Sequence, residues 1–329
     1  MKSAVIIILV IVIAFLVYYI IKNTILPKKT TMAQTYLDQS NILKAIRMAK
    51  LAVEKDTEDA EAHFMLGKAF LADRRDEQAF REYRSASRLG ISGKDIPETE
   101  FRETLAFLYA KFNEVEEALK EYVMLIKAHP ENPGYYFQAG KLFSVRNKSD
   151  LAEQYYRKAI SLNTKEPEYY FELGILYFSS KRIREATGVF GAALKLNPLD
   201  NRLLLYMGKC MKESKDYAEA LPYLEKAARD QELKLRALVE LGGCYMSLKM
   251  MDKAIMELER AVAIIKSEGD LDSMYAHYFL AMCFEKTKEY AKAIGQWEKI
   301  YAQKKNFRDV GEKLAKYRSY RQKESGTKS

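Results

Sequence analysis

Residues 167–200 read PEYYFELGILYFSSKRIREATGVFGAALKLNPLD, and this stretch decides the fold expected of the whole chain. Apolar residues such as Leu173 and Tyr177 recur at intervals of three and four, as do Ala186 and Phe190 further on. Such spacing is typical of amphipathic helices. The stretch therefore predicts two consecutive helices, each with one apolar face.

The same pattern recurs along most of the chain. Units of 34 residues can be numbered from residues 26, 60, 99, 133, 167, 201, 235 and 274. Position 8 is then always small: Ala33, Gly67, Ala106, Gly140, Gly174, Gly208, Gly242 and Ala281. Position 20 is alanine in every unit: Ala45, Ala79, Ala118, Ala152, Ala186, Ala220, Ala254 and Ala293. Small residues in these two positions leave room for large side chains from a facing helix.

These residues resemble a known family. The spacing Tyr170-x2-Leu173-Gly174-x2-Tyr177, followed by Ala186, Phe190 and Pro198, is similar to that of the tetratricopeptide repeat. The resemblance covers residues 26–307 and implies an all-α, right-handed solenoid of eight helix–turn–helix repeats. Two insertions, residues 94–98 and 269–273, fall between repeats and are expected to form loops.

The N-terminal region, residues 1–25, has a different composition. Residues 4–21 (AVIIILVIVIAFLVYYII) contain no charge, and an apolar helix of this length approaches the roughly 30 Å of a bilayer core. A cleaved signal peptide is the alternative, but the apolar run exceeds the usual length and no suitable cleavage site follows closely. We therefore expect one transmembrane helix and a short linker.

The charges beside this segment predict its orientation. Lys22, Lys28 and Lys29 follow it, whereas Lys2 precedes it. Positive residues favour the cytoplasmic side. The repeats of this single-pass membrane protein are therefore expected to face the cytoplasm.

The C-terminal region, residues 308–329, is predicted to form a basic capping helix and a disordered tail. Phe307, Val310, Leu314 and Tyr317 form one more apolar stripe at helical spacing, which would cover the end of the repeat array. The alternative is a basic helix that contacts anionic lipid or an acidic partner.

The sequence indicates neither an enzyme nor a nucleic-acid-binding protein. Most of the net charge of +9 lies near the ends, so the repeat region is nearly neutral and has no basic stripe. No cofactor loop or catalytic set is evident, and we predict no cofactor and no metal. Three cysteines, Cys210, Cys244 and Cys283, all occupy position 10 of their repeats, which is typical of buried apolar packing.

The resemblance also implies a partner-binding surface. In this family, positions 2, 5, 9, 12 and 13 of each first helix line a concave face. The residues predicted to bind a protein or peptide there are Phe64, Lys68, Phe107, Lys111, Phe137, Lys141, Phe171, Ile175, Phe178, Arg202, Lys209 and Lys212. Aromatic anchors and lysines would suit a partner with apolar and acidic groups. Packing of the phenylalanines against neighbouring repeats is the alternative.

Two functions are compatible with this layout. The first is a membrane-anchored scaffold or adaptor that binds a partner protein on its concave face. The second is a structural assembly factor that forms homo-oligomers at the membrane. The fold alone does not choose between them, because function depends on the site.

Overall fold

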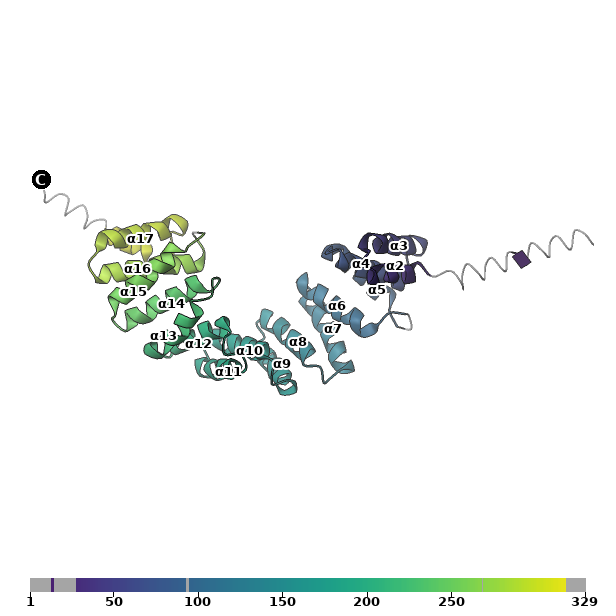
Figure 1. The fold of residues 1–329 in the computed structure, drawn as a ribbon, viewed down its shortest axis with the longest axis horizontal. Helices are drawn as coiled ribbons and strands as arrows, with labels where there is room; N and C mark the ends of the chain where they lie inside the picture. The colour runs from purple at the N-terminus through teal and green to yellow at the C-terminus, as the bar shows by residue number, and fades with distance from the viewer. Residues whose placement is uncertain (1–12, 15–27, 93–94, 268, 318–329) are drawn as a thin grey trace, which may run out of the picture. The chain divides into compact units, whose positions relative to one another are not determined.

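The computed structural model describes residues 13–14, 28–92, 95–267 and 269–317. Within these ranges the regular elements are helices, and Figure 1 follows them from α2 to α17. Their bounds are α2 Lys29–Asp38, α3 Ile42–Lys55, α4 Ala60–Ala72, α5 Asp76–Leu89, α6 Glu98–Lys111, α7 Val115–Ala128, α8 Pro133–Val145, α9 Ser149–Leu162, α10 Pro167–Ser179, α11 Ile183–Leu196, α12 Asn201–Glu213, α13 Tyr217–Ala227, α14 Lys234–Ser247, α15 Met251–Ala263, α16 Leu271–Lys286 and α17 Tyr290–Gln303. A further helical stretch covers residues 310–317. The predicted all-α class is confirmed.

The chain divides into two compact units, residues 1–147 and 148–329. The border falls in the turn between α8 and α9. Within each unit, successive helices pair and stack: α4 contacts α5, α10 contacts α11, and α14 contacts α15. Each unit therefore buries its apolar surface between neighbouring helix pairs, as repeat proteins do.

Local sequence explains where several helices begin. Pro133 and Pro167 occupy the first turns of α8 and α10, where proline fits without losing a hydrogen bond. The side chain of Asp200 accepts hydrogen bonds from the backbone N–H groups of Arg202 and Leu203 and so caps α12. These starts coincide with residues 133, 167 and 201, from which the repeats were numbered.

The two insertions between repeats are not wholly loops, which corrects the sequence prediction. Residues 271–273 form the first turn of α16, and Glu98 begins α6. Asp270 caps α16 by accepting a hydrogen bond of 2.7 Å from the backbone N–H of Ser273. The cap extends the helix by almost one turn beyond the 34-residue template.

Tight turns join the helices of each pair. One residue in each turn has a left-handed backbone although it is not glycine. These residues are Ser40, Arg74, Asn113, Asn147, Lys181, Lys215, Lys249 and Lys288. Lys215 has φ of 70°. This left-handed conformation is sterically unfavourable for any residue that has a Cβ atom.

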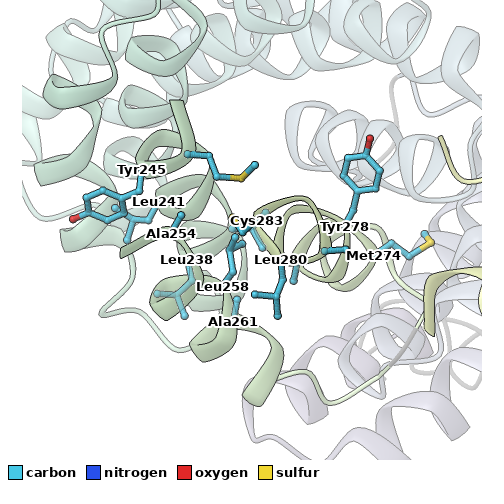
Figure 2. Packing of buried hydrophobic residues seen from close by; sticks show 14 of the residues in the cluster. Leu238, Leu241, Tyr245, Ala254, Leu258, Ala261, Met274, Tyr278, Leu280 and Cys283 are labelled. Carbon is cyan, nitrogen blue, oxygen red and sulfur yellow. The ribbon is translucent and has the colours of Figure 1, made fainter. Parts of the chain in front are cut away.

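Each unit has its own apolar core. The core of the first unit extends from Ala33 to Leu108 and that of the second from Leu204 to Tyr317. Figure 2 shows part of the second core, where side chains from three helices pack together: Leu238 and Leu241 of α14, Leu258 of α15 and Leu280 of α16. Alanine in position 20 is completely buried in every repeat, as its recurrence in the register predicts.

The apolar stripe after α17 belongs to this second core. Phe307, Val310, Leu314 and Tyr317 are all buried. The ring of Tyr317 stacks on that of Trp297, with centroids 5.4 Å apart, and its hydroxyl donates a hydrogen bond to Glu285. Because its apolar side is occupied in this way, the stretch packs as a cap on α16 and α17 rather than as an exposed amphipathic helix.

Among the helices that the structure describes, none combines the length and apolar character needed to cross a membrane. The segment predicted to do so, residues 4–21, lies outside the described residues except for positions 13 and 14. The predicted tail beyond residue 317 lies outside them too.

Candidate partner-binding surface

The first helix of each repeat carries the residues predicted to bind a partner, and the structure places them in two separate sets. Phe64, Lys68, Phe107, Lys111, Phe137 and Lys141 belong to α4, α6 and α8 of the first unit. The remaining predicted residues belong to α10 and α12 of the second unit, and are Phe171, Ile175, Phe178, Arg202, Lys209 and Lys212.

Phe64 is a core residue, which corrects its prediction as a contact for a partner. Its side chain is only 2% exposed. Its ring lies between those of Tyr83 and Phe101, with centroids 5.7 and 5.8 Å away. Lys68 lies above the same ring at 5.3 Å and pairs with Glu100 at 2.9 Å.

The other two phenylalanines predicted to bind a partner in the first unit differ from each other. Phe107 is 53% exposed, whereas Phe137 is 7% exposed and offers little surface to a partner. Lys111 and Lys141 each follow one of these phenylalanines by four residues, and their ammonium groups lie 5.9 and 5.6 Å from the ring centroids. Residues four apart share a helix face, which explains this repeated cation–π pairing.

In the second unit, Tyr206 joins the predicted aromatic residues into one cluster. Its ring meets those of Phe171 and Phe178 edge-on, each at 5.7 Å between centroids. Arg202 lies over Phe171 at 4.6 Å, and Lys209 lies over Phe178 at 5.4 Å. Phe171, Phe178 and the neighbouring Ile175 are half-buried, so part of each remains exposed.

A groove on the second unit is the strongest candidate site. It has a volume of about 290 Å³, and α10, α12, α14 and α16, together with the segment before residue 310, supply its lining. We call it the C-terminal groove and define it by Phe178, Lys209, Lys212, Glu213, Arg236, Val239, Glu240, Leu271, Asp272, Tyr275, Phe279 and Arg308. Every helix that lines it is the first helix of its repeat, so the hollow lies on the face on which the family resemblance places ligands.

Three of the four cations in the groove form ion pairs within the protein. Lys209 and Lys212 lie 3.7 and 2.5 Å from the carboxylate of Glu240. Arg236 pairs with Asp272 at 2.9 Å, and this hydrogen bond raises the pKa of the arginine. Lysines that already have carboxylate partners attract an acidic ligand less than the sequence suggested.

The prediction from sequence missed several residues of this groove. Arg236 and Tyr275 occupy position 2 of their repeats, as Arg202 does, so extending the same register to the last two repeats would have found them. Arg308 lies after the last repeat, and no register applies to it. Its guanidinium lies 5.0 Å from the centroid of Tyr275.

The three cysteines do not form a site. All are buried free thiols, which agrees with the packing role predicted for them. Burial raises the pKa of Cys210 and of Cys244 to about 11 and that of Cys283 to about 12. The reactive thiolate is therefore scarce at neutral pH.

Comparison with protein-family models identifies the class of protein. Three models described as tetratricopeptide repeats match residues 211–277, residues 30–93 and 263–308, and residues 133–166. These ranges together cover more than half of the chain, and they agree with the paired helices described above. The chain is therefore a tetratricopeptide repeat protein, and proteins built of these repeats generally mediate interactions between proteins.

Solved structures of low sequence identity share the fold. A tetratricopeptide repeat protein from Parabacteroides merdae has a TM-score of 0.57 at 15% identity, covering 78% of this chain and 98% of that one. The C-terminal part of a repeat protein from Cytophaga hutchinsonii has a TM-score of 0.52 at 18% identity, covering 87% and 99%. No curated protein matches the sequence.

A third structure is the hetero-tetramer Cut9–Hcn1 of the APC/C. Its TM-score is 0.57 at 17% identity. The match covers 87% of this chain but 54% of that one, so this chain spans about half the length of the other. At these identities, all three likenesses concern the fold alone.

Proposed function

We propose that this protein is a membrane-anchored scaffold that binds a partner protein on the face formed by the first helices of its repeats. The observation that carries the proposal is the C-terminal groove, which only first helices and the segment around Arg308 line. Leu271, 57% exposed at its border, and the half-buried Phe178 offer apolar surface to a partner. Aromatic and aliphatic anchors of this kind supply much of the binding energy at protein interfaces.

Photo-crosslinking from the groove tests the scaffold function. A photoreactive residue replaces Leu271 in the full-length protein within native membranes, and Lys195, exposed on the second helix α11, serves as the control position. A discrete product from position 271 alone is expected. Identical products from both positions, or none from position 271, would contradict a partner-binding role for the groove.

The membrane anchor is the second part of the proposal. The uncharged segment of residues 4–21 supports it, and Lys22, Lys28 and Lys29 after the segment support a cytoplasmic location for the repeats. Full-length protein is expected to stay in the membrane pellet after alkaline extraction, whereas a variant that lacks residues 1–27 is released. Release of both proteins would refute the anchor. Protease added to the cytoplasmic face of sealed vesicles should digest the repeats.

Self-assembly is the competing function, and two measurements distinguish it from the scaffold function. If the protein is a scaffold for other proteins, the mass of the detergent-solubilised chain corresponds to a monomer, and crosslinks from position 271 reach a different protein. If crosslinks from position 271 reach only other copies of this chain, and the detergent-solubilised mass corresponds to an oligomer, the scaffold proposal gives way to a homo-oligomer.

A further inference from the structure

Arg308 lies at the border of the C-terminal groove, between two anchored residues. Its backbone is left-handed, with φ of 48°. The next residue on either side is anchored: Phe307 is buried edge-on against Tyr275, and Asp309 accepts a hydrogen bond of 2.8 Å from the hydroxyl of Tyr278. The guanidinium lies 5.0 and 5.2 Å from the centroids of Tyr275 and Tyr278, and it donates a hydrogen bond to the hydroxyl of Tyr275.

The groove carries one excess positive charge, because Lys209, Lys212, Arg236 and Arg308 line it together with Glu213, Glu240 and Asp272. Lys209 and Lys212 share Glu240, and Arg236 pairs with Asp272. Within the described part of the chain, the partners of the Arg308 side chain are the rings and hydroxyls of Tyr275 and Tyr278, and no carboxylate pairs with it. Its planar guanidinium lines the groove and has further N–H groups, which can bind a carboxylate with both oxygens.

An apolar hollow adjoins the groove. It measures about 270 Å³, shares Lys212 and Phe279 with the groove, and is walled by Met246 and Met282. Gly243 shapes it, since a Cβ atom there would lie 3.0 Å from the ammonium nitrogen of Lys212. Methionine side chains adapt to apolar groups of varied shape. Because the two hollows share residues, one extended segment can occupy both.

We propose that the C-terminal groove binds an extended segment of the partner protein that carries an acidic side chain and a nearby apolar side chain. Arg308 receives the carboxylate, and the wall formed by Met246, Phe279 and Met282 receives the apolar group. The excess charge of the groove supports an acidic ligand, and the continuity of the two hollows supports a chain that passes through rather than one that ends at Arg308. This inference rests on the proposed scaffold function and names the chemistry of its partner.

Selection from a peptide library provides the first test. Short random peptides, fused through their C-terminal ends to a phage coat protein, expose no terminal carboxylate and are selected on the full-length protein in detergent. Enrichment of Asp or Glu close to Leu, Met, Phe or Ile is expected. Failure to select any peptide, or selection of peptides without acidic residues, would overturn the inference.

Measurements with a selected peptide give the second test. Arg308→Gln should weaken its binding about tenfold or more, as loss of a charged hydrogen bond predicts. Replacement of the acidic residue of the peptide by its amide should weaken binding to the native protein equally, yet add little in the variant, because both changes remove one contact. Arg308→Lys should retain part of the affinity.

Lys305→Gln is the matched control, since Lys305 is exposed in the same segment and does not line the groove. It should leave the affinity unchanged, and unaltered circular dichroism should show that both variants fold. Equal affinities of the Arg308→Gln variant and the native protein would overturn the inference. So would losses of affinity that simply add when the protein change and the peptide change are combined. The scaffold function itself would still stand if crosslinking from position 271 captured a distinct partner.

Discussion

The ring of Phe190 in α11 packs directly over Gly174 in α10. A Cβ atom built on Gly174 would lie 2.4 Å from Cε1 of that ring, far inside a normal contact. Gly242 and Leu258 show the same relationship two repeats later, where a Cβ atom built on Gly242 would lie 2.4 Å from Cγ of Leu258. In these two repeats, the glycine in position 8 therefore makes room for the large side chain in position 24, which the second helix of the same repeat supplies.

Gly174→Ala should destabilise the second unit by about 1–3 kcal/mol, because the added methyl group overlaps a buried ring that has no room to move. Urea unfolding followed by circular dichroism measures the effect. Gly188→Ala is the control, since Gly188 lies within α11 and a Cβ atom there meets nothing within 4 Å. This variant should gain about 0.5–1 kcal/mol from helix propensity. Equal effects at both positions would contradict the packing explanation.

Lys215→Gly should stabilise the protein, because glycine adopts the left-handed turn between α12 and α13 without the steric cost that lysine bears there. We expect a net gain of about 0.5–1 kcal/mol in the free energy of unfolding, because relief of roughly 1–2 kcal/mol of steric cost outweighs the entropy that glycine loses on folding. Lys120→Gly provides the contrast, since Lys120 is 75% exposed within α7 and glycine there should cost about 1 kcal/mol. A loss of stability in both variants would argue against strain in the turn.

Glu153 is expected to make stability depend on pH. Burial raises the pKa of this carboxyl, but hydrogen bonds from Tyr177, Arg182 and Arg157 outweigh that effect and lower the pKa from 4.5 to about 2. A carboxylate whose pKa is depressed on folding stabilises the fold above its unfolded pKa, and the contribution is lost as pH falls through the folded pKa.

Glu153→Gln should therefore destabilise the protein at neutral pH by about 1–3 kcal/mol, the range for hydrogen bonds to charged groups. The difference from the native protein should shrink as the pH falls from about 4.5 to about 2. Urea unfolding at several pH values measures it. Glu219→Gln, at an exposed position of α13, should show a small difference at every pH. A constant difference for Glu153→Gln would refute the assigned role.

Leu314→Ala should loosen the cap at the end of the second unit. Leu314 is 3% exposed, and truncating a buried leucine costs about 2–5 kcal/mol. Trp297, the single tryptophan of the chain, is buried beside Tyr317 of the same cap, so its fluorescence should shift to the red at lower urea concentration than in the native protein. Glu312→Ala, at an exposed position of the cap, should leave the transition in place. Unchanged fluorescence for Leu314→Ala would contradict the capping role.

The fold was largely predictable from sequence because one steric rule repeats. A small residue in position 8 and alanine in position 20 define where two helices approach, and this requirement is visible without coordinates. The start of α16 was not predictable in this way, because the capping side chain of Asp270 adds a turn that the 34-residue template does not contain. Local hydrogen bonding there overrides the register.

The candidate site was less predictable, because a residue's position in the 34-residue repeat does not determine whether its side chain is buried. Phe64 and Phe171 share position 5, yet Phe64 is packed between Tyr83 and Phe101 whereas Phe171 remains half-buried. Ion pairing was hidden for a similar reason. Lys212 and Glu240 are 28 residues apart, and their contact depends on how neighbouring repeats stack.

The three buried thiols have a practical consequence. Cys210, Cys244 and Cys283 lie one in each of the last three repeats, and each is both inaccessible and protonated in the folded state. An alkylating reagent can modify each one only when its own repeat opens. The chain thus contains three natural reporters, and the order in which mass spectrometry finds them alkylated would give the sequence of opening events along this end of the protein, without any engineered probe.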